Sequence, residues 1–280
     1  MNHAATQPPR IFDSAHYARQ QARARRADVA PILHELYARA VDNLCDLSRR
    51  FPRITAVGVA DDMLQEACNN AGYATQIDAV PTDWLQTEIL PLAPASCDAI
   101  VSVCGLHTIN DMVGSFIQLR QALTPDGVLV ALLPGPATLS ELRDTMAVIE
   151  TAQHGGISPR IAPFLEIRDA GNLLGRAGFA LPVIDSDMIT LDYSGLPALH
   201  ADLRAAGQSN MLAGRAAQPL SRSFYHAMAQ HYAAHHSNAD GRLRATLEVV
   251  SLTAWSPHAS QQKPLQRGSG ELSLKDFLEG

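Results

Sequence analysis

The sequence predicts an α/β fold in which a largely parallel β-sheet carries helices on both faces. Two observations predict it: short apolar runs alternate with amphipathic runs from residue 54 to 133, and the turns between them are short. The run CDAIVSVC (97–104) is typical of a strand that is buried on both faces of a parallel sheet. Ligands of such folds bind beyond the carboxyl ends of the strands, so we expect a site near residues 58–62, 82–84 and 104–107.

Composition and charge exclude several classes of protein. The 280 residues are 46% hydrophobic, which is enough to bury a substantial core. The net charge of -6 argues against a nucleic-acid-binding protein, and no apolar run approaches the ~20 residues of a membrane-spanning helix. The cysteines form no CxxC pair, so we interpret them as reduced, packed thiols of an intracellular protein, without a zinc site: Cys45, Cys68, Cys97 and Cys104.

The chain should begin with helices and continue into the sheet. Apolar residues recur at helical spacing before residue 50, and Pro31 should divide this region into two helices. The first strand is predicted at Ile54–Val59 and the second at Ala74–Val80. The helix between them should end near Gly72.

The next units repeat the alternation of strands and helices. After the strand at 97–104 we predict a helix over 111–123, and the turn TPDG (124–127) should start the apolar strand VLVALL. Thr138 and Glu141 have the spacing of a capping box, which would open a helix that ends near residue 153.

The last part of the sheet should be antiparallel. The loop HGGISPRIAPF (154–164) is long enough to cover a site, and a helix should end at Gly178. Pro182–Tyr193 reads as a strand, and residues 242–255 alternate like a half-exposed antiparallel strand.

The segment between these two strands is predicted to be helical and to cap the sheet. One helix should end at Gly207 and another should begin at Pro219. The predicted division is therefore an N-terminal helical region (1–50), an α/β domain (51–194 and 241–256), a helical cap (195–240) and a C-terminal tail (257–280).

Several blocks of the sequence resemble a known family. The strand and helix CDAIVSVCGLHTINDM, followed by LRQALTPDGVLVALLPG, are similar to the fourth and fifth strand units of class I S-adenosylmethionine (SAM) methyltransferases. A closer resemblance is to the methyltransferase-like assembly factors of respiratory complex I and their alphaproteobacterial relatives. The carrier-protein methyltransferases of biotin synthesis are more distant cousins. The closer resemblance is carried by IFDSAHYARQQARAR (11–25), GPATLSELR (135–143), GGISPRIAPF (155–164), NLLGRAGF (172–179), GQSN (207–210) and SQQKPLQRGS (260–269).

This resemblance implies a Rossmann-like sheet of five parallel strands and a late antiparallel pair, with SAM bound at the strand ends. It implies either methyl transfer or the hydroxylation of an arginine in a protein target, which would be a peripheral subunit of complex I. The implied location is the cytoplasm of a bacterium or the mitochondrial matrix of a eukaryote.

The cofactor loop departs from the family pattern. About forty residues separate the strand at Ile54 from the strand at Cys97, which leaves room for one helix where the family has two strand-helix units. Gly58 is the one glycine where the family has a glycine-rich loop, and Ala60 stands where the ribose-binding acid is expected. We therefore expect a sheet that is one strand-helix unit short, a narrowed cofactor pocket and weak affinity.

Each candidate cofactor residue before the third strand has a structural alternative. Gly58 could admit the cofactor or simply end a strand. Asp61 and Asp62 could bind ribose hydroxyls, but they could equally cap a helix. Asp83 and Trp84 fall where the family contacts adenine, although Trp84 could instead close the core.

Two further candidates follow the third strand. Cys104 and His107 lie where the family faces its cofactor and substrate, and the histidine could orient a substrate or move a proton. A polar residue at a strand-end turn is the alternative. His231 and His235 have metal-ligand spacing, but we interpret them as a solvated helix face because no third ligand is evident.

Two functional hypotheses follow. The first is a SAM-dependent enzyme, and the second is a non-catalytic pseudo-methyltransferase that binds a protein partner through the loop at 154–164 and the cap. Arg143 and Arg160 could bind an acidic partner or substrate, or they could form structural ion pairs. The shortened cofactor loop favours the second hypothesis, whereas the downstream blocks fit either.

Overall fold

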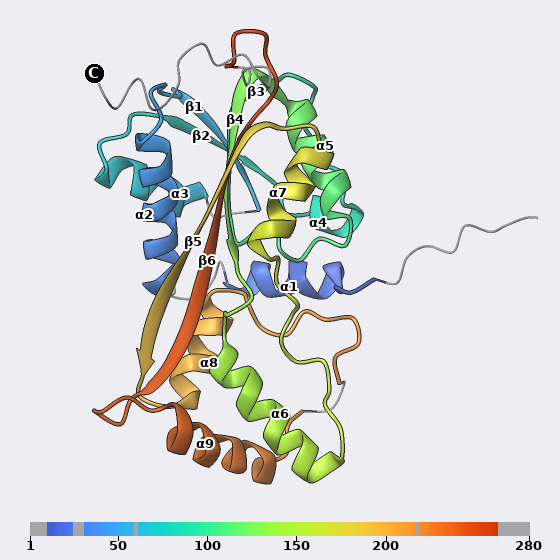
Figure 1. Ribbon diagram of the computed structural model, residues 1–280, viewed down its shortest axis with the longest axis vertical. Coiled ribbons are helices and arrows are strands. Elements are labelled where there is room, and N and C mark those ends of the chain that lie inside the picture. The colour runs from blue at the N-terminus through green and yellow to red at the C-terminus, as the bar shows by residue number, and fades with distance from the viewer. Residues whose placement is uncertain (1–9, 25–30, 59–60, 217–218, 263–280) are drawn as a thin grey trace, which may run out of the picture.

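The computed structural model describes residues 10–24, 31–58, 61–216 and 219–262. These residues contain one six-stranded sheet in the order β2-β1-β3-β4-β6-β5 (Figure 1). The strands are β1 (Arg53–Val57), β2 (Gln76–Val80), β3 (Cys97–Val103), β4 (Leu123–Pro134), β5 (Ala180–Tyr193) and β6 (Leu243–Trp255). The predicted α/β fold is confirmed.

The sheet is one strand shorter than the resemblance implies. The first four strands of the chain pair in parallel, and β6 runs antiparallel between β4 and β5. The described residues therefore supply four parallel strands and an antiparallel pair, where the family pattern has five and a pair. This agrees with the expectation that the sheet is one strand-helix unit short.

Helices cover both faces of the sheet (Figure 1). Successive residues of a strand point to opposite faces, so Ile100 belongs to one apolar cluster and Val101 to the other. One face is covered by α2 (Pro31–Cys45) and α3 (Asp61–Asn70), and the other by α4 (Trp84–Thr87), α5 (Met112–Ala122) and α7 (Ile167–Arg176). No described helix is long and apolar enough to cross a membrane.

The first helix lies across the carboxyl ends of the parallel strands. This is α1 (Ser14–Ala24), and the hydroxyl of its buried Tyr17 donates to the carbonyl of Cys104 at 3.0 Å, directly after β3. As predicted, the N-terminal region holds two helices, and the second begins at Pro31. The residues between them lie outside the described part of the chain.

A group of three helices packs beyond the same ends of the strands, around the extensions of β5 and β6 (Figure 1). These helices are α6 (Ser140–His154), α8 (Leu196–Ala205) and α9 (Arg222–His236). We call this group the cap. Buried Phe224, Met228 and Tyr232 of α9 form its core with Leu142 of α6 and Leu199 of α8. The predicted cap contained α8 and α9 but not α6.

The predicted capping box is wrong. The N-cap of α6 is Leu139, and neither Thr138 nor Glu141 caps the helix. The hydroxyl of Thr138 instead bonds both the amide and the carbonyl of Glu248, each at 3.2 Å, and the Glu141 carboxylate accepts from the amide of Thr246 at 3.0 Å. β4 ends before it can pair with this part of β6, so these two side chains bond the amides of Thr246 and Glu248 in its place.

Two other local predictions also need correction. The helix α9 begins at Arg222 rather than Pro219, because the side chain of Ser221 accepts from the amide of Phe224 at 3.1 Å and caps it. The predicted turn TPDG lies within β4, where the pairing with β3 shifts register.

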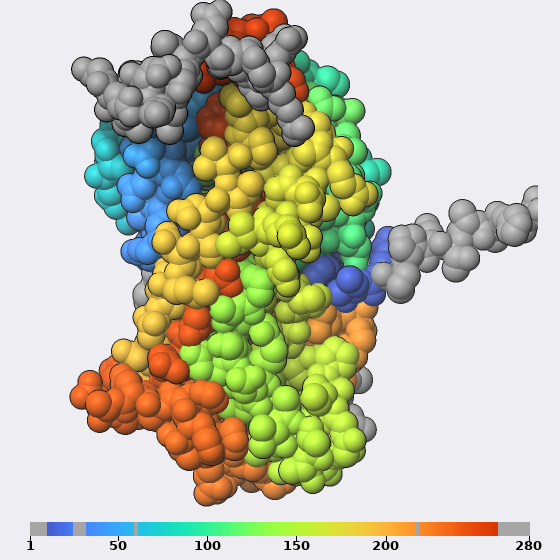
Figure 2. Space-filling model, in the orientation of Figure 1, coloured from blue at the N-terminus to red at the C-terminus, as the bar shows by residue number. Residues whose placement is uncertain are grey.

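The strand β5 forms one edge of the sheet and runs diagonally across the face shown in Figure 2. Its side chains alternate between half-buried and exposed over most of its length, and Met188 is 61% exposed. The strand therefore bridges the sheet to the cap while it remains at the surface.

Candidate functional site

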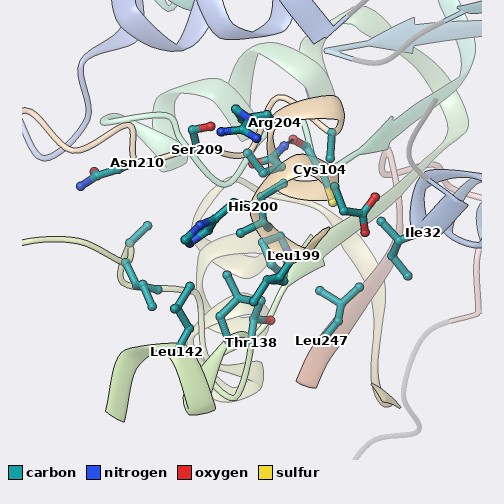
Figure 3. Close-up of a pocket in the computed structure, with 18 of the residues that line it drawn as sticks. Ile32, Cys104, Thr138, Leu142, Leu199, His200, Arg204, Ser209, Asn210 and Leu247 are labelled. Atoms are coloured by element: carbon teal, nitrogen blue, oxygen red, sulfur yellow. Dashed lines mark hydrogen bonds between the residues drawn. The ribbon is translucent and has the colours of Figure 1, made fainter. Parts of the chain in front are cut away.

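A cavity of about 370 Å³ lies between the carboxyl ends of the parallel strands and the cap. Its size falls in the range of about 300–1,000 Å³ that small-molecule sites occupy. It is lined by α2, by the segments after β3 and β4, by the loop at 160–164, by the ends of β5 and β6, and by α8 with the residues that follow it (Figure 3). Of the three segments where the sequence predicted a site, 104–107 contributes to this lining, whereas Gly58, Asp61, Asp62 and residues 82–84 do not.

His107 is the most buried titratable side chain that lines this cavity. It is 4% exposed, and its Nε2 lies 3.0 Å from the amide oxygen of Gln208. Burial lowers the pKa of His107 to about 4, so the ring is neutral at physiological pH. No described group bonds its Nδ1, which leaves one buried nitrogen without a partner.

Cys104 also lines the cavity, but its thiol is not activated. Burial raises the pKa of the Cys104 thiol to about 12, which keeps the sulfur protonated and weakly nucleophilic. Its carbonyl accepts from the hydroxyl of Tyr17 and, at 3.4 Å, from the side-chain amide Nε2 of Gln208. Cys104 therefore acts as a fixed backbone anchor for its neighbours.

Gly58 packs against another segment of the chain. It has a φ of +67°, and a Cβ built on Gly105 would lie 2.6 Å from the Gly58 carbonyl oxygen. A Cβ on Gly58 would in turn lie 3.0 Å from the Cα of Gly105. Both glycines thus allow the end of β1 to touch the backbone that follows β3, which accounts for Gly58 without a ligand.

The other four candidates before β3 do not line this cavity. Asp61 and Asp62 are exposed in the first turn of α3, and Asp83 is exposed before α4. Trp84 is 3% exposed and belongs to the core, so its ring offers no stacking face to adenine. Ala60 lies outside the described residues.

Cys104 and His107 are thus the two predicted cofactor residues that reach the cavity, whereas Gly58, Asp61, Asp62, Asp83 and Trp84 do not. At the end of β1, where the resemblance places SAM, Gly58 lies against the backbone of Gly105. The residues assigned to SAM from the sequence therefore do not form one cradle for it.

Sequence reasoning missed the cap residues that line the cavity. They include His200, Asp202 and Arg204 of α8 and Gln208, and Tyr193 at the end of β5 (Figure 3 labels His200 and Arg204). The block GQSN (207–210) marked this region through the resemblance. Nothing in the pattern of α8 identified its polar residues as cavity residues.

Arg143 and Arg160, for which the sequence allowed two roles, both bond groups of the protein itself. Arg160 lines the cavity, and its guanidinium bonds the fully buried carboxylate of Glu150 at 2.6 and 2.7 Å. Burial alone would raise the pKa of Glu150, but the Ser158 amide and the Arg160 guanidinium hold that pKa below its usual value. Arg143 donates to the carbonyls of Pro136 and Thr138.

The histidine pair of α9 does not line the cavity. The rings of His231 and His235 stack with centroids 4.1 Å apart, and the His235 side chain bonds the His231 carbonyl at 2.9 Å. Within the described ranges, no group of three or more histidine, cysteine or carboxylate side chains could hold a metal ion.

Sequence comparisons match this chain to one domain family and to two groups of known proteins. A methyltransferase domain family matches residues 40–131. The chain is 32% identical to the mitochondrial arginine-hydroxylase NDUFAF5 of Danio rerio, over 87% of this chain and 80% of that protein. It is 33% identical to the malonyl-[acyl-carrier protein] O-methyltransferase of Xylella fastidiosa (strain M23), over 88% of this chain and 89% of that protein.

A structural comparison gives the same fold. A Bacillus halodurans protein described as a methyltransferase superposes with a TM-score of 0.50 at 11% identity, over 79% of this chain and 99% of that one. The resemblance predicted from the sequence blocks is confirmed. The chain therefore belongs to the methyltransferase-like family that includes the arginine-hydroxylase NDUFAF5 proteins.

Proposed function

We propose that this protein is a methyltransferase-like assembly factor of respiratory complex I that acts on an arginine side chain of a protein target. The observation that carries the proposal is the identity of 32–34% to the NDUFAF5 arginine-hydroxylases of vertebrates over 87–88% of the chain. The cavity between the sheet and the cap supports it, because it lies at the ligand-binding edge of the fold.

The target in this proposal is a peripheral subunit of complex I, and its arginine enters the cavity from the cap side. The loop at 154–164 and α8 both contribute to the cavity lining, so a bound protein can contact them while its side chain is enclosed. The proposed location is the bacterial cytoplasm, or the mitochondrial matrix in a eukaryote. We also propose that the chain divides as its sequence predicts, into an N-terminal helical region, an α/β domain, a helical cap and a C-terminal tail.

S-adenosylmethionine is the cofactor expected of a methyltransferase domain, and it would supply an activated methyl group. The residues assigned to SAM from the sequence do not converge at this cavity. At the cavity the chain itself provides a neutral histidine, a protonated thiol, polar side chains of α8 and apolar walls.

A second candidate function is a non-catalytic assembly factor, and the contact between Gly58 and Gly105 favours it. Isothermal titration with SAM and with its demethylated product separates the two. Micromolar binding would support the enzyme, and no heat up to millimolar ligand would support the non-catalytic protein.

The main proposal is tested by deleting the gene in its own host and returning the unaltered chain. We expect complex I assembly to be lost and then restored, and one arginine of a peripheral subunit to regain the mass of an added oxygen atom or methyl group. Normal assembly and an unchanged set of arginine masses in the deletion strain would contradict the proposal.

A further inference from the structure

Three ionisable side chains that line the cavity are either paired or neutral. Arg160 is paired with the buried carboxylate of Glu150, and burial lowers the pKa values of His107 and His200, which favours their neutral forms. Among the residues that line the cavity, Asp202 is the one carboxylate, and no ion pair joins it to a cation in the described part of the chain.

The Asp202 carboxylate accepts one hydrogen bond within the described part of the chain and can accept more. The hydroxyl of Tyr193 donates to its Oδ2 at 2.6 Å, and no other described group bonds the carboxylate. Two carboxylate oxygens can accept about four hydrogen bonds, so capacity remains for a further donor. Tyr193 comes from the end of β5 and Asp202 from α8, so the bond fixes the carboxylate to the rigid sheet.

The remainder of the lining suits the stem of a long side chain. Leu142 and Met146 of α6, Leu199 and Leu203 of α8, and Leu247 of β6 supply apolar walls (Figure 3 labels Leu142, Leu199 and Leu247). Arginine combines three methylene groups with a planar group of five N–H donors. An apolar passage that contains one carboxylate complements both parts.

We propose that Asp202 binds the guanidinium group of the target arginine, and that Tyr193 positions the Asp202 carboxylate for this contact. The inference rests on the proposed function, since the arginine target comes from it. Arg204 also lines the cavity, but it is exposed to solvent, which screens its repulsion of a guanidinium. Arg160 is already neutralised by Glu150.

The test compares two blocked tripeptides, acetyl-Gly-Arg-Gly-amide and its citrulline analogue, which has the same shape without the charge. Binding to the full chain is followed by NMR titration. We expect the arginine peptide to bind about tenfold more tightly, which is the size of one charge-assisted hydrogen bond. Asp202→Asn should reduce this preference to about onefold, because the amide keeps the shape of the side chain and loses its charge.

Two further variants separate recognition from stability. Tyr193→Phe keeps the ring and should lower the preference for arginine by several fold, while binding of the citrulline peptide stays constant. Asp42 is an exposed acid on α2 that lies outside the cavity lining. Asp42→Asn should therefore leave the affinities for the arginine and citrulline peptides unchanged. If Asp202→Asn weakened both peptides equally, or neither, the inference would be overturned.

The same variants returned to the deletion strain distinguish this inference from the proposed function. If the unaltered chain restores complex I assembly and Asp202→Asn restores it equally well, Asp202 does not bind the target and the function stands. If the unaltered chain restores nothing, the proposed function fails, and the preference for arginine over citrulline alone decides the role of Asp202.

Discussion

The polar side chains around the cavity have charge states that are set by burial and by single bonded partners. His107, Glu150 and Asp202 illustrate three cases: a base that burial keeps neutral, an acid that is paired inside the fold, and an acid that one hydroxyl holds. Each case gives a different response to pH or to substitution.

His107 should make the stability of the protein depend on pH in weakly acidic solution. Its pKa is about 4 in the folded protein, against an ordinary value of 6.5 for the unfolded chain. Between these values the unfolded state binds the extra proton, so the free energy of unfolding falls as the pH falls. The expected loss is about 3 kcal/mol.

Urea unfolding at a series of pH values between 7 and 4 measures this loss. The chain has other histidines besides His107, so the comparison is with His107→Gln, whose profile should be flatter by about 3 kcal/mol. Parallel profiles for the two proteins would show that His107 is not held neutral by the fold.

Glu150 should stabilise the loop that covers the cavity. Its fully buried carboxylate bonds both Arg160 and the amide of Ser158, so Glu150→Gln leaves a half-buried guanidinium without its counter-charge. The free energy of unfolding should fall by about 3 kcal/mol. Glu35→Gln is the matched control, since its pair with Arg39 is exposed and should contribute under about 0.5 kcal/mol. Equal effects in a denaturation experiment would contradict this account.

At the scale of elements, the strands and the sheet helices could be predicted because their burial is periodic along the sequence. The apolar run at 97–104 and the helix at 112–122 lie where they were expected. The missing strand-helix unit could also be predicted, since the spacing from Ile54 to Cys97 leaves no room for it.

Contacts between distant elements could not be predicted. Thr138 and Glu141 have the spacing of a capping box, but the unpaired edge of β6 takes their hydrogen bonds instead. Trp84 has a residue type suited to stacking on adenine, and only its burial in the fold shows that it belongs to the core. Asp202 was missed because nothing near it in the sequence shows that Tyr193 and the cavity are its neighbours.

The contact between the end of β1 and the segment after β3 gives a prediction about elements. Gly105→Ala places a Cβ 2.6 Å from the Gly58 carbonyl oxygen, so one of the two segments must move. The expected loss in the free energy of unfolding is about 1–3 kcal/mol, measured by urea denaturation. Gly156→Ala is the control, because a Cβ there has no neighbour within 4 Å. Equal stability of the two variants would mean that the two segments do not touch as described.

At the scale of the whole molecule, the sheet and the cap form one enclosure with the cavity between them. The strands β5 and β6 extend from the sheet to the cap, so both walls of the cavity are fixed to the same two strands (Figure 1). Membership of the family limits the reactions that the protein is expected to perform. The enclosure indicates where a target side chain can be held.

The central claim is that a target side chain enters this cavity during complex I assembly, and a cavity-filling variant tests it most directly. Leu203→Trp fills the cavity from α8, while Val148→Trp adds the same side chain at an exposed position of α6. Both are returned to the deletion strain, and complex I assembly and the mass of the target arginine are measured. We expect Val148→Trp to restore both and Leu203→Trp to restore neither, although the two proteins melt at similar temperatures. Full restoration by Leu203→Trp would contradict the claim.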